Sequence, residues 1–179
     1  MSGKVFLISP EAPPHQFAGA GDTRKIKAGG IRLGTLDNTK GNADHLLAFV
    51  VENLQKVLNI SSVLVMRKNN PSTPAPAPVL DRLAAECDFV ISAMGDWGSC
   101  TSWSVHDMCE LRKRGLVTAV IYSGPFEKLG RNQARTFGVP ELPLVEITHP
   151  LGGLALQDVR QRADEAAPQF AELVRKYAS

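Results

Sequence analysis

The segment DFVISAMGDWGSCTSWS, residues 88–104, decides the fold, because it joins a buried strand to a polar loop and then to a helix. Residues 89–94 are almost entirely apolar, as in strands that are covered on both faces. Small and polar residues follow, and helical spacing runs from about Ser102 to Arg114, where Gly115 is a usual stop. A strand that passes into a helix in this way indicates the β–α unit of a parallel sheet.

The same alternation extends on both sides of this segment. Further strands are expected at residues 31–36, 62–66, 117–122 and 144–148, with helical patterns between them. Right-handed crossovers then give a parallel sheet covered on both faces. The sequence predicts a single-domain, flavodoxin-like (Rossmann-like) α/β fold with three layers and about five parallel strands in the order 2-1-3-4-5.

The predicted α/β domain occupies residues 31–179, and its last helix contains Pro168, which is expected to kink or restart it. Residues 1–30 do not fit the alternating pattern. We expect them to form an N-terminal arm or an edge strand.

Composition excludes several classes of protein. A formal net charge of +2 is too small to indicate a nucleic-acid partner by itself. The three cysteines have no metal-like spacing and favour a reducing compartment, and no apolar run approaches the roughly 20 residues of a membrane span. We therefore expect a cytoplasmic protein without membrane or nucleic-acid partners, acting on a small molecule and forming a homo- or hetero-oligomer.

Polar residues collect in the loops that follow the first, third, fourth and fifth predicted strands. Ligands of open parallel α/β sheets bind beyond the carboxyl ends of the strands, and these loops all lie at that edge. Because the first and third strands are predicted neighbours, their loops should bring together Asp37, Asn38, Lys40, Asp96, Ser99 and Cys100.

Cys100 is the leading catalytic candidate. It is predicted just before a helix N-terminus, where free N–H groups and the helix dipole stabilise a thiolate that could attack an electrophile. The alternative is a small, inert, buried cysteine. Cys87 and Cys109 lie in apolar helical patterns and are expected to serve packing.

The two histidines near the predicted edge are candidates for proton transfer. His149 follows a buried strand and could donate a proton or polarise a substrate, or it could only form a turn. His106 could act as a base, orient a substrate or lie at the surface. It is one helical turn from Cys109, but two ligands without a zinc-like pattern do not predict a metal site.

The remaining candidates have both a binding and a structural interpretation. Asp37 and Asp96 could bind a cation, act as bases or cap turns, and Lys40 could neutralise an anion or be solvated. The loop at Ser123 could offer backbone donors to an oxyanion. No glycine-rich nucleotide motif is present, so no flavin, nicotinamide or other cofactor is predicted.

The segment GDWGSCTSWSVHD resembles the UGSC family of selenoproteins and their cysteine homologues, whose motif reads GDUGSCTSWSxHD, or GDCGSCTSWSxHD. The segments LDNTKGNAD, AAECDFVISAMGD and HPLGGL resemble the same family, so the resemblance covers about residues 31–160. It implies a redox-like activity and a distant similarity to the U-x-x-C segments of selenium-dependent amino-acid reductases. Cys100 matches the retained cysteine, and the matching pocket positions are Asp37, Asn38, Asp96, Ser99, Thr101, His106, His149 and Pro150.

Position 97 is where the chain departs from the family motif, because Trp97 replaces the selenocysteine or cysteine. UGA specifies selenocysteine in some contexts and tryptophan in some genetic codes, so Trp97 reflects either recoding or a gene that encodes tryptophan. In the second case no disulfide can join positions 97 and 100. Trp97 and Ser102 are then expected to contribute to the substrate pocket.

These observations lead to two hypotheses for function. The first is a small-molecule enzyme that uses Cys100, either as a thiol or selenol reductase or in single-cysteine covalent, lyase or dehydratase chemistry. The second is a catalytically divergent binding or regulatory subunit of a heteromeric complex.

Overall fold

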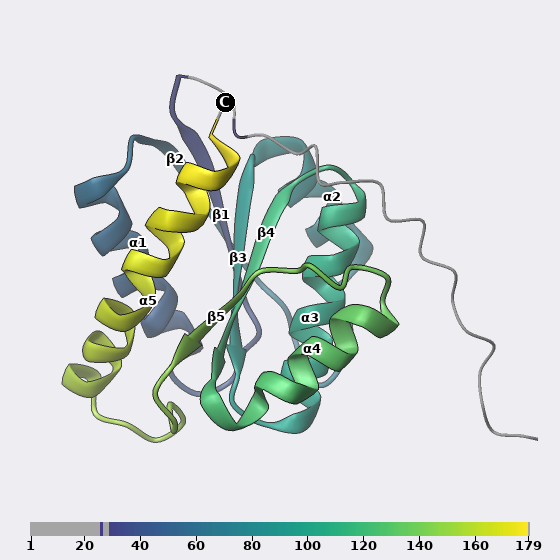
Figure 1. Ribbon diagram of the computed structural model, residues 1–179, viewed down its shortest axis with the longest axis vertical. Helices are drawn as coiled ribbons and strands as arrows, with labels where there is room; N and C mark the ends of the chain where they lie inside the picture. Colours follow the sequence, from purple (N-terminus) through teal and green to yellow (C-terminus); the bar gives the residue numbers. More distant parts are fainter. Residues whose placement is uncertain (1–25, 27–28, 179) are drawn as a thin grey trace, which may run out of the picture.

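The computed structural model describes residues 26 and 29–178, and it shows the predicted three-layer α/β fold (Figure 1). All strands are parallel and their order is β2-β1-β3-β4-β5, which confirms the predicted flavodoxin-like topology. The strands are β1 (Ile31–Asp37), β2 (Ile60–Arg67), β3 (Phe89–Gly95), β4 (Val117–Ser123) and β5 (Leu144–Ile147). The α-helices are α1 (Ala43–Val57), α2 (Ala77–Glu86), α3 (Gly98–Lys113), α4 (Glu127–Thr136) and α5 (Leu156–Tyr177), with a short 3-10 turn at Gly124–Phe126.

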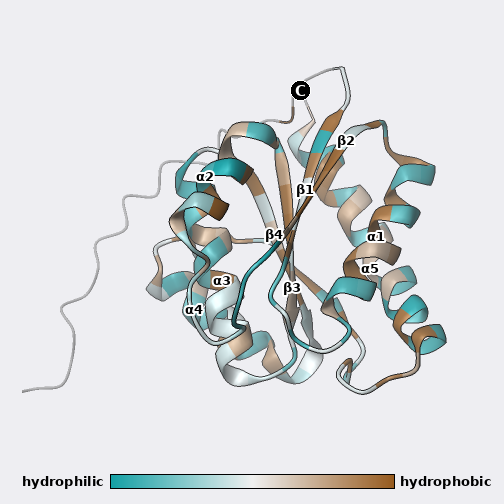
Figure 2. Cartoon of the chain, turned by 180° about the vertical axis from the view of Figure 1, so that it is seen from behind, coloured by the Kyte–Doolittle hydropathy of each residue, from teal (hydrophilic) through white to brown (hydrophobic). Residues whose placement is uncertain are grey.

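Two hydrophobic clusters fill the space between the layers. Helices α1 and α5 cover one face of the sheet, where Phe89 of β3 meets Phe170 of α5 at 6.1 Å between ring centroids. Helices α2, α3 and α4 cover the other face, around Leu83, Val105 and Met108. Figure 2 shows apolar residues along the central strands and hydrophilic ones on the outer sides of the helices. Every residue of β3 and β4 is consequently buried, as their apolar sequences predict.

Helix α3 begins four residues earlier than the sequence suggested, at Gly98 instead of Ser102. Trp97 is the extended N-cap residue, and its carbonyl accepts the N–H and the hydroxyl of Thr101, at 3.1 and 2.6 Å. These hydrogen bonds stabilise a first turn whose small residues have low intrinsic helix propensity. Cys100 therefore lies inside the first turn of α3 and not just before the helix.

Pro168 does not restart the last helix, because α5 continues from Leu156 to Tyr177. Burial explains this continuity. Ala163 and Ala167 before the proline and Phe170 after it all pack on the same sheet face, so tertiary packing outweighs the lost backbone hydrogen bond.

The expectation for residues 1–30, an arm or an edge strand, falls mainly on residues 1–25 and 27–28, which lie outside the described ones. Ile26 is described: it forms a parallel bridge with Ala178, and its N–H donates to the carbonyl of Tyr177 at 2.8 Å. Among the described residues, no helix combines the length and apolarity that a membrane span requires.

Gly34 allows α2 to pack closely on β1, so Gly34→Ala should lower the free energy of unfolding by about 1–3 kcal/mol. A Cβ at this position would lie 2.8 Å from Cys87 Sγ and 2.9 Å from Leu83 Cδ2. Urea denaturation would measure the loss. The matched control is Gly41→Ala, whose Cβ meets nothing within 4 Å and should leave stability nearly unchanged. Equal stability of the two variants would contradict the close packing.

Candidate functional site

The carboxylate of Asp96, directly after β3, is the centre of a polar cluster at the carboxyl edge of the sheet. Asp96 is 2% exposed. Its Oδ1 accepts the hydroxyl of Ser123 at 2.5 Å and lies 3.1 Å from Nδ1 of His149. Its Oδ2 accepts the backbone N–H groups of Leu151 and Gly152 at 3.2 and 3.0 Å. One buried carboxylate thus joins the ends of β3 and β4 to the loop after β5.

This arrangement determines how the His149 ring is used. An ionised carboxylate can only accept hydrogen bonds, so Nδ1–H of His149 donates to Asp96. The Ser123 hydroxyl is also 3.0 Å from Nδ1, and its own proton is directed to Asp96. The Nε2 atom remains for a substrate, because the side chain of His149 is 40% exposed. An aspartate that orients a histidine in this manner is a recurring acid–base arrangement.

His149 faces an open groove of about 640 Å³ beside β5. The residues that line this groove are Gly124, Glu146, Ile147, Thr148, His149, Glu165 and Gln169. The ring of Phe126 lies 6.0 Å from the His149 ring. Pro150 follows through a cis peptide bond, in the loop whose amides bind Asp96.

Asn38 connects the loop after β1 to β3 and α3. Its side-chain amide donates to the carbonyl of Met94 at 2.8 Å and to the hydroxyl of Ser104 at 3.0 Å. Its Oδ1 accepts the N–H of Lys40 at 3.1 Å, and Asn38 itself is fully buried. These contacts give Asn38 a positioning role for the loop that carries Lys40.

Asp37 holds the same loop from the side of β2. Its carboxylate accepts the N–H of Thr39 at 2.7 Å and pairs with Arg67 at 2.9 Å. Burial raises the pKa of Asp37 above its usual value, and the Thr39 N–H and the Arg67 charge oppose this shift. Arg67, at the end of β2, was not among the candidates from the sequence.

Lys40 and Trp97 meet where the loops after β1 and β3 approach each other. The ammonium of Lys40 lies 5.5 Å from the centroid of the Trp97 ring, within reach of a cation–π interaction. Trp97 is 61% exposed, so the residue at the position of the motif's missing chalcogen faces solvent.

Cys100 is buried, and its thiol donates to the carbonyl of Trp97 at 3.3 Å. Trp97 supplies no side-chain cap, so the first-turn N–H groups around Cys100 keep the partial positive charge of a helix N-terminus. The other cysteines differ. Burial raises the pKa of Cys87 to about 11 and that of Cys109 to about 12, which keeps both as thiols.

The hydroxyl residues around Cys100 take two directions. Thr101 and Ser102 bond back to the carbonyls of Trp97 and Gly98, at 2.6 and 3.0 Å, and so stabilise the helix. Ser99 instead points outward, and its Oγ lies 3.0 Å from Oγ of Ser72. Ser72 belongs to the proline-rich loop between β2 and α2, residues 68–76.

His106 lies apart from the Asp96–His149 pair, between α3 and the end of α4. Its ring meets Trp103 and Phe137 edge-on, with centroids 5.2 and 5.0 Å away, and its Nδ1 is 3.2 Å from Oδ1 of Asp107. In the described part of the chain, no three His, Cys, Asp or Glu side chains are arranged to hold a metal ion.

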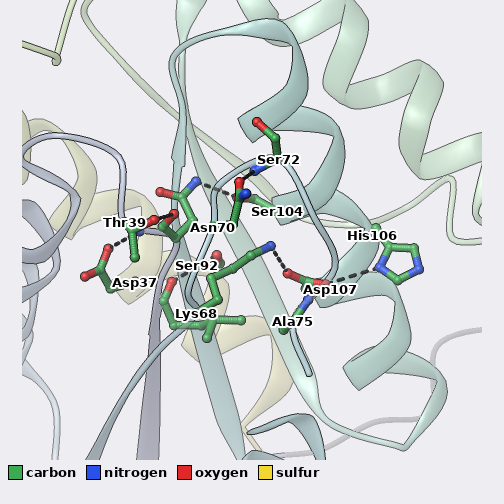
Figure 3. A network of polar contacts seen from close by, with 12 residues as sticks. Asp37, Thr39, Lys68, Asn70, Ser72, Ala75, Ser92, Ser104, His106 and Asp107 are labelled. Carbon is green, nitrogen blue, oxygen red and sulfur yellow. Dashed lines mark hydrogen bonds and ion pairs between the residues drawn. The ribbon is translucent and has the colours of Figure 1, made fainter. Parts of the chain in front are cut away.

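Lys68 and Asp107 form a buried ion pair, and neither residue was a candidate from the sequence (Figure 3). Their side chains are 1% and 0% exposed and are joined at 2.6 Å. Asp107 also accepts the N–H of Ala75 at 2.9 Å, which fixes the proline-rich loop against α3. Asp107 lies one turn after Ser104 on the buried face of α3. A charged residue at such a position is the sequence pattern that could have indicated a buried ion pair.

The chain is similar to one protein family and to several solved structures. The model of the UGSC family matches residues 7–176. A diflavin flavoprotein A3 from Nostoc sp. is 14% identical with a TM-score of 0.48, and the match covers 82% of this chain and 95% of that one. A short-chain flavodoxin associated with a non-canonical PDU bacterial microcompartment is 13% identical with a TM-score of 0.43, covering 77% and 97% of the two chains. No curated protein matches the chain significantly.

Removing the Lys68 charge should leave Asp107 buried without its cation. Lys68→Met should therefore lower the free energy of unfolding by about 3–5 kcal/mol, as measured by urea denaturation. Arg82→Met is the control, because Arg82 pairs with Glu86 at the surface and its removal should cost about 0.5 kcal/mol or less. If both variants lose a similar free energy of unfolding, the buried pair contributes no more to stability than the surface pair.

Proposed function

The chain belongs to the UGSC family, and from this premise we propose that it is a small-molecule enzyme in which Cys100 supplies a thiol and His149 transfers protons. The substrate binds at the carboxyl edge of the sheet, between the loops after β1, β3, β4 and β5. The observation that carries the proposal is the Asp96–His149 contact of 3.1 Å. It orients an imidazole whose second nitrogen is free to reach a bound molecule.

The polar environment supports the use of His149 as a general acid and base. Besides its contact with His149, Asp96 accepts the backbone N–H groups of Leu151 and Gly152, which fixes the loop that carries the histidine. As a carboxylate it stabilises the imidazolium that forms when His149 accepts a proton. Ser123 holds the same carboxylate oxygen at 2.5 Å and so fixes its orientation.

The proposed covalent step needs no external oxidant or reductant. The sulfur of Cys100 adds to an electrophilic carbon of the substrate, so that an S–C bond forms while a C=O or C=C π bond breaks. The thiol proton passes to His149, and the imidazolium returns it to the substrate oxygen or carbon. The first-turn N–H groups of α3 stabilise the negative charge that develops in between.

Trp97 favours this single-cysteine chemistry over a thiol redox couple. Tryptophan carries no sulfur or selenium, so no bond can join position 97 to Cys100. The exposed indole and the ammonium of Lys40, 5.5 Å from its centroid, instead offer a flat surface and a positive charge to a planar or anionic substrate.

One observation favours a second candidate, a binding or regulatory subunit without catalytic activity. The thiol of Cys100 is buried and already donates to the carbonyl of Trp97 at 3.3 Å. A cysteine that remains in this position would serve packing alone.

Alkylation by limiting iodoacetamide, followed by peptide mass spectrometry from pH 6 to 10, separates the two candidates. For the enzyme, Cys100 should react at pH 7 at least about tenfold faster than a peptide of residues 96–104, because the peptide lacks the folded site with its first-turn N–H groups of α3 and its base His149. Cys87 and Cys109 are internal controls, and their pKa values of about 11 and 12 should keep both unreactive throughout most of this range.

The variant His149→Ala tests the proton transfer in the same experiment. It should slow the alkylation of Cys100, whereas His45→Ala, a control on the outer side of α1 beside Phe49, should not. If Cys100 reacts no faster than the peptide, the enzyme proposal is wrong and the binding role is supported.

A further inference from the structure

The two edge strands of the sheet, β5 and β2, differ in whether side chains from elsewhere in the chain bind their outer backbone groups. At the β5 edge, the side-chain amide of Gln169 accepts the N–H of Glu146 at 3.2 Å and donates to its carbonyl at 2.7 Å. Glu165 accepts the N–H of Thr148 at 2.7 Å. Side chains of α5 thus take the place of a further strand, and β5 is closed to pairing.

Strand β2 forms the opposite edge, and its outer side is open. The N–H of Lys68 donates to the carbonyl of Asp37 in β1 at 2.9 Å. Because backbone groups alternate in direction along a strand, those of Val63, Val65 and Arg67 point away from β1. In the part of the chain that the structure describes, no hydrogen bond reaches the backbone groups of Val63 or Val65 on that side.

The sequence of β2 lacks the features that normally protect an edge. Ile60–Met66 contains no charged residue and no proline, and Val65 is 71% exposed. Beside it lies a mainly apolar groove of about 490 Å³ between α1 and β2. The apolar residues that line it are Leu47, Ala48, Val51, Val63 and Val65.

We infer that this edge binds a second copy of the chain. The two β2 strands pair in antiparallel orientation about a two-fold axis at Val65 and join both sheets into one. Val65 of each copy then exchanges its N–H and C=O hydrogen bonds with Val65 of the other, and the two side chains cover the apolar grooves. A two-fold interface requires a self-complementary patch, and an uncharged open strand satisfies this requirement.

The charges of the chain are compatible with a second copy at the β2 edge. The small formal charge of +2 gives little repulsion between copies. The axis places Arg67 of one copy opposite the uncharged Val63 of the other, and Arg67 keeps its own partner Asp37 at 2.9 Å. No like charges therefore face each other along the paired strands.

The inference is independent of the proposed chemistry, because the Asp96–His149 cluster involves the ends of β3, β4 and the loop after β5. Dimerisation at β2 leaves the groove beside His149 open. Either proposal can therefore fail without the other.

Sedimentation velocity over a dilution series tests the dimer. At micromolar concentration, the mass of the wild-type protein from its sedimentation and diffusion should be twice the 19.3 kDa of one chain. Val65→Lys puts two ammonium groups against each other across the axis, and it should raise the dissociation constant at least roughly tenfold. Val57→Lys is the matched control: Val57 is 63% exposed at the end of α1, it lines a groove with residues of α5 and not of β2, and this variant should remain dimeric.

Amide hydrogen exchange keeps the test decisive if Val65→Lys folds poorly. In the wild-type protein, the amides of Val63 and Val65 should be protected at high concentration and exchange faster on dilution. A wild-type chain that stays monomeric, or a dimer that persists in folded Val65→Lys, overturns the inference and assigns the edge to another occupant or to none.

Discussion

The buried carboxylate of Asp96 is the interaction on which the polar edge of this fold depends. A charged group at a position that is 2% exposed is costly unless donors surround it. Here the donors come from Ser123, from His149 and from the amides of Leu151 and Gly152. Satisfying one charge therefore fixes the relative positions of β3, β4 and the loop after β5. The orientation of His149 is a direct consequence.

The fold could be read from the sequence because its strands are short apolar runs between helical patterns. Strand order followed from general rules for parallel sheets, and the structure agrees. Local hydrogen bonds were harder to foresee. The carbonyl of Trp97 accepts the N–H and hydroxyl of Thr101, which moves the start of α3 ahead of Cys100, and no residue pattern announces this capping geometry.

The sequence identified single residues of the site, but it did not predict how their side chains contact one another. Asp96, Ser123 and His149 were separate candidates, and sequence spacing could not show that they share one carboxylate oxygen, since 53 positions separate Asp96 from His149. His106 matched the same family motif, yet it packs between Trp103 and Phe137 because it projects toward α4. The Lys68–Asp107 pair joins segments 39 positions apart and depends wholly on the packing of α3 against the loop after β2.

The most direct test of the central role of Asp96 is the ¹⁵N NMR spectrum of the His149 ring in the neutral state. If the carboxylate orients the imidazole as described, the proton resides on Nδ1 and Nε2 shows the shift of an unprotonated nitrogen. This tautomer is the less common one for a free histidine side chain, so its presence would identify the Asp96 contact. A His149 ring protonated on Nε2 would contradict the account, because Nδ1 would then have no proton to donate to Asp96.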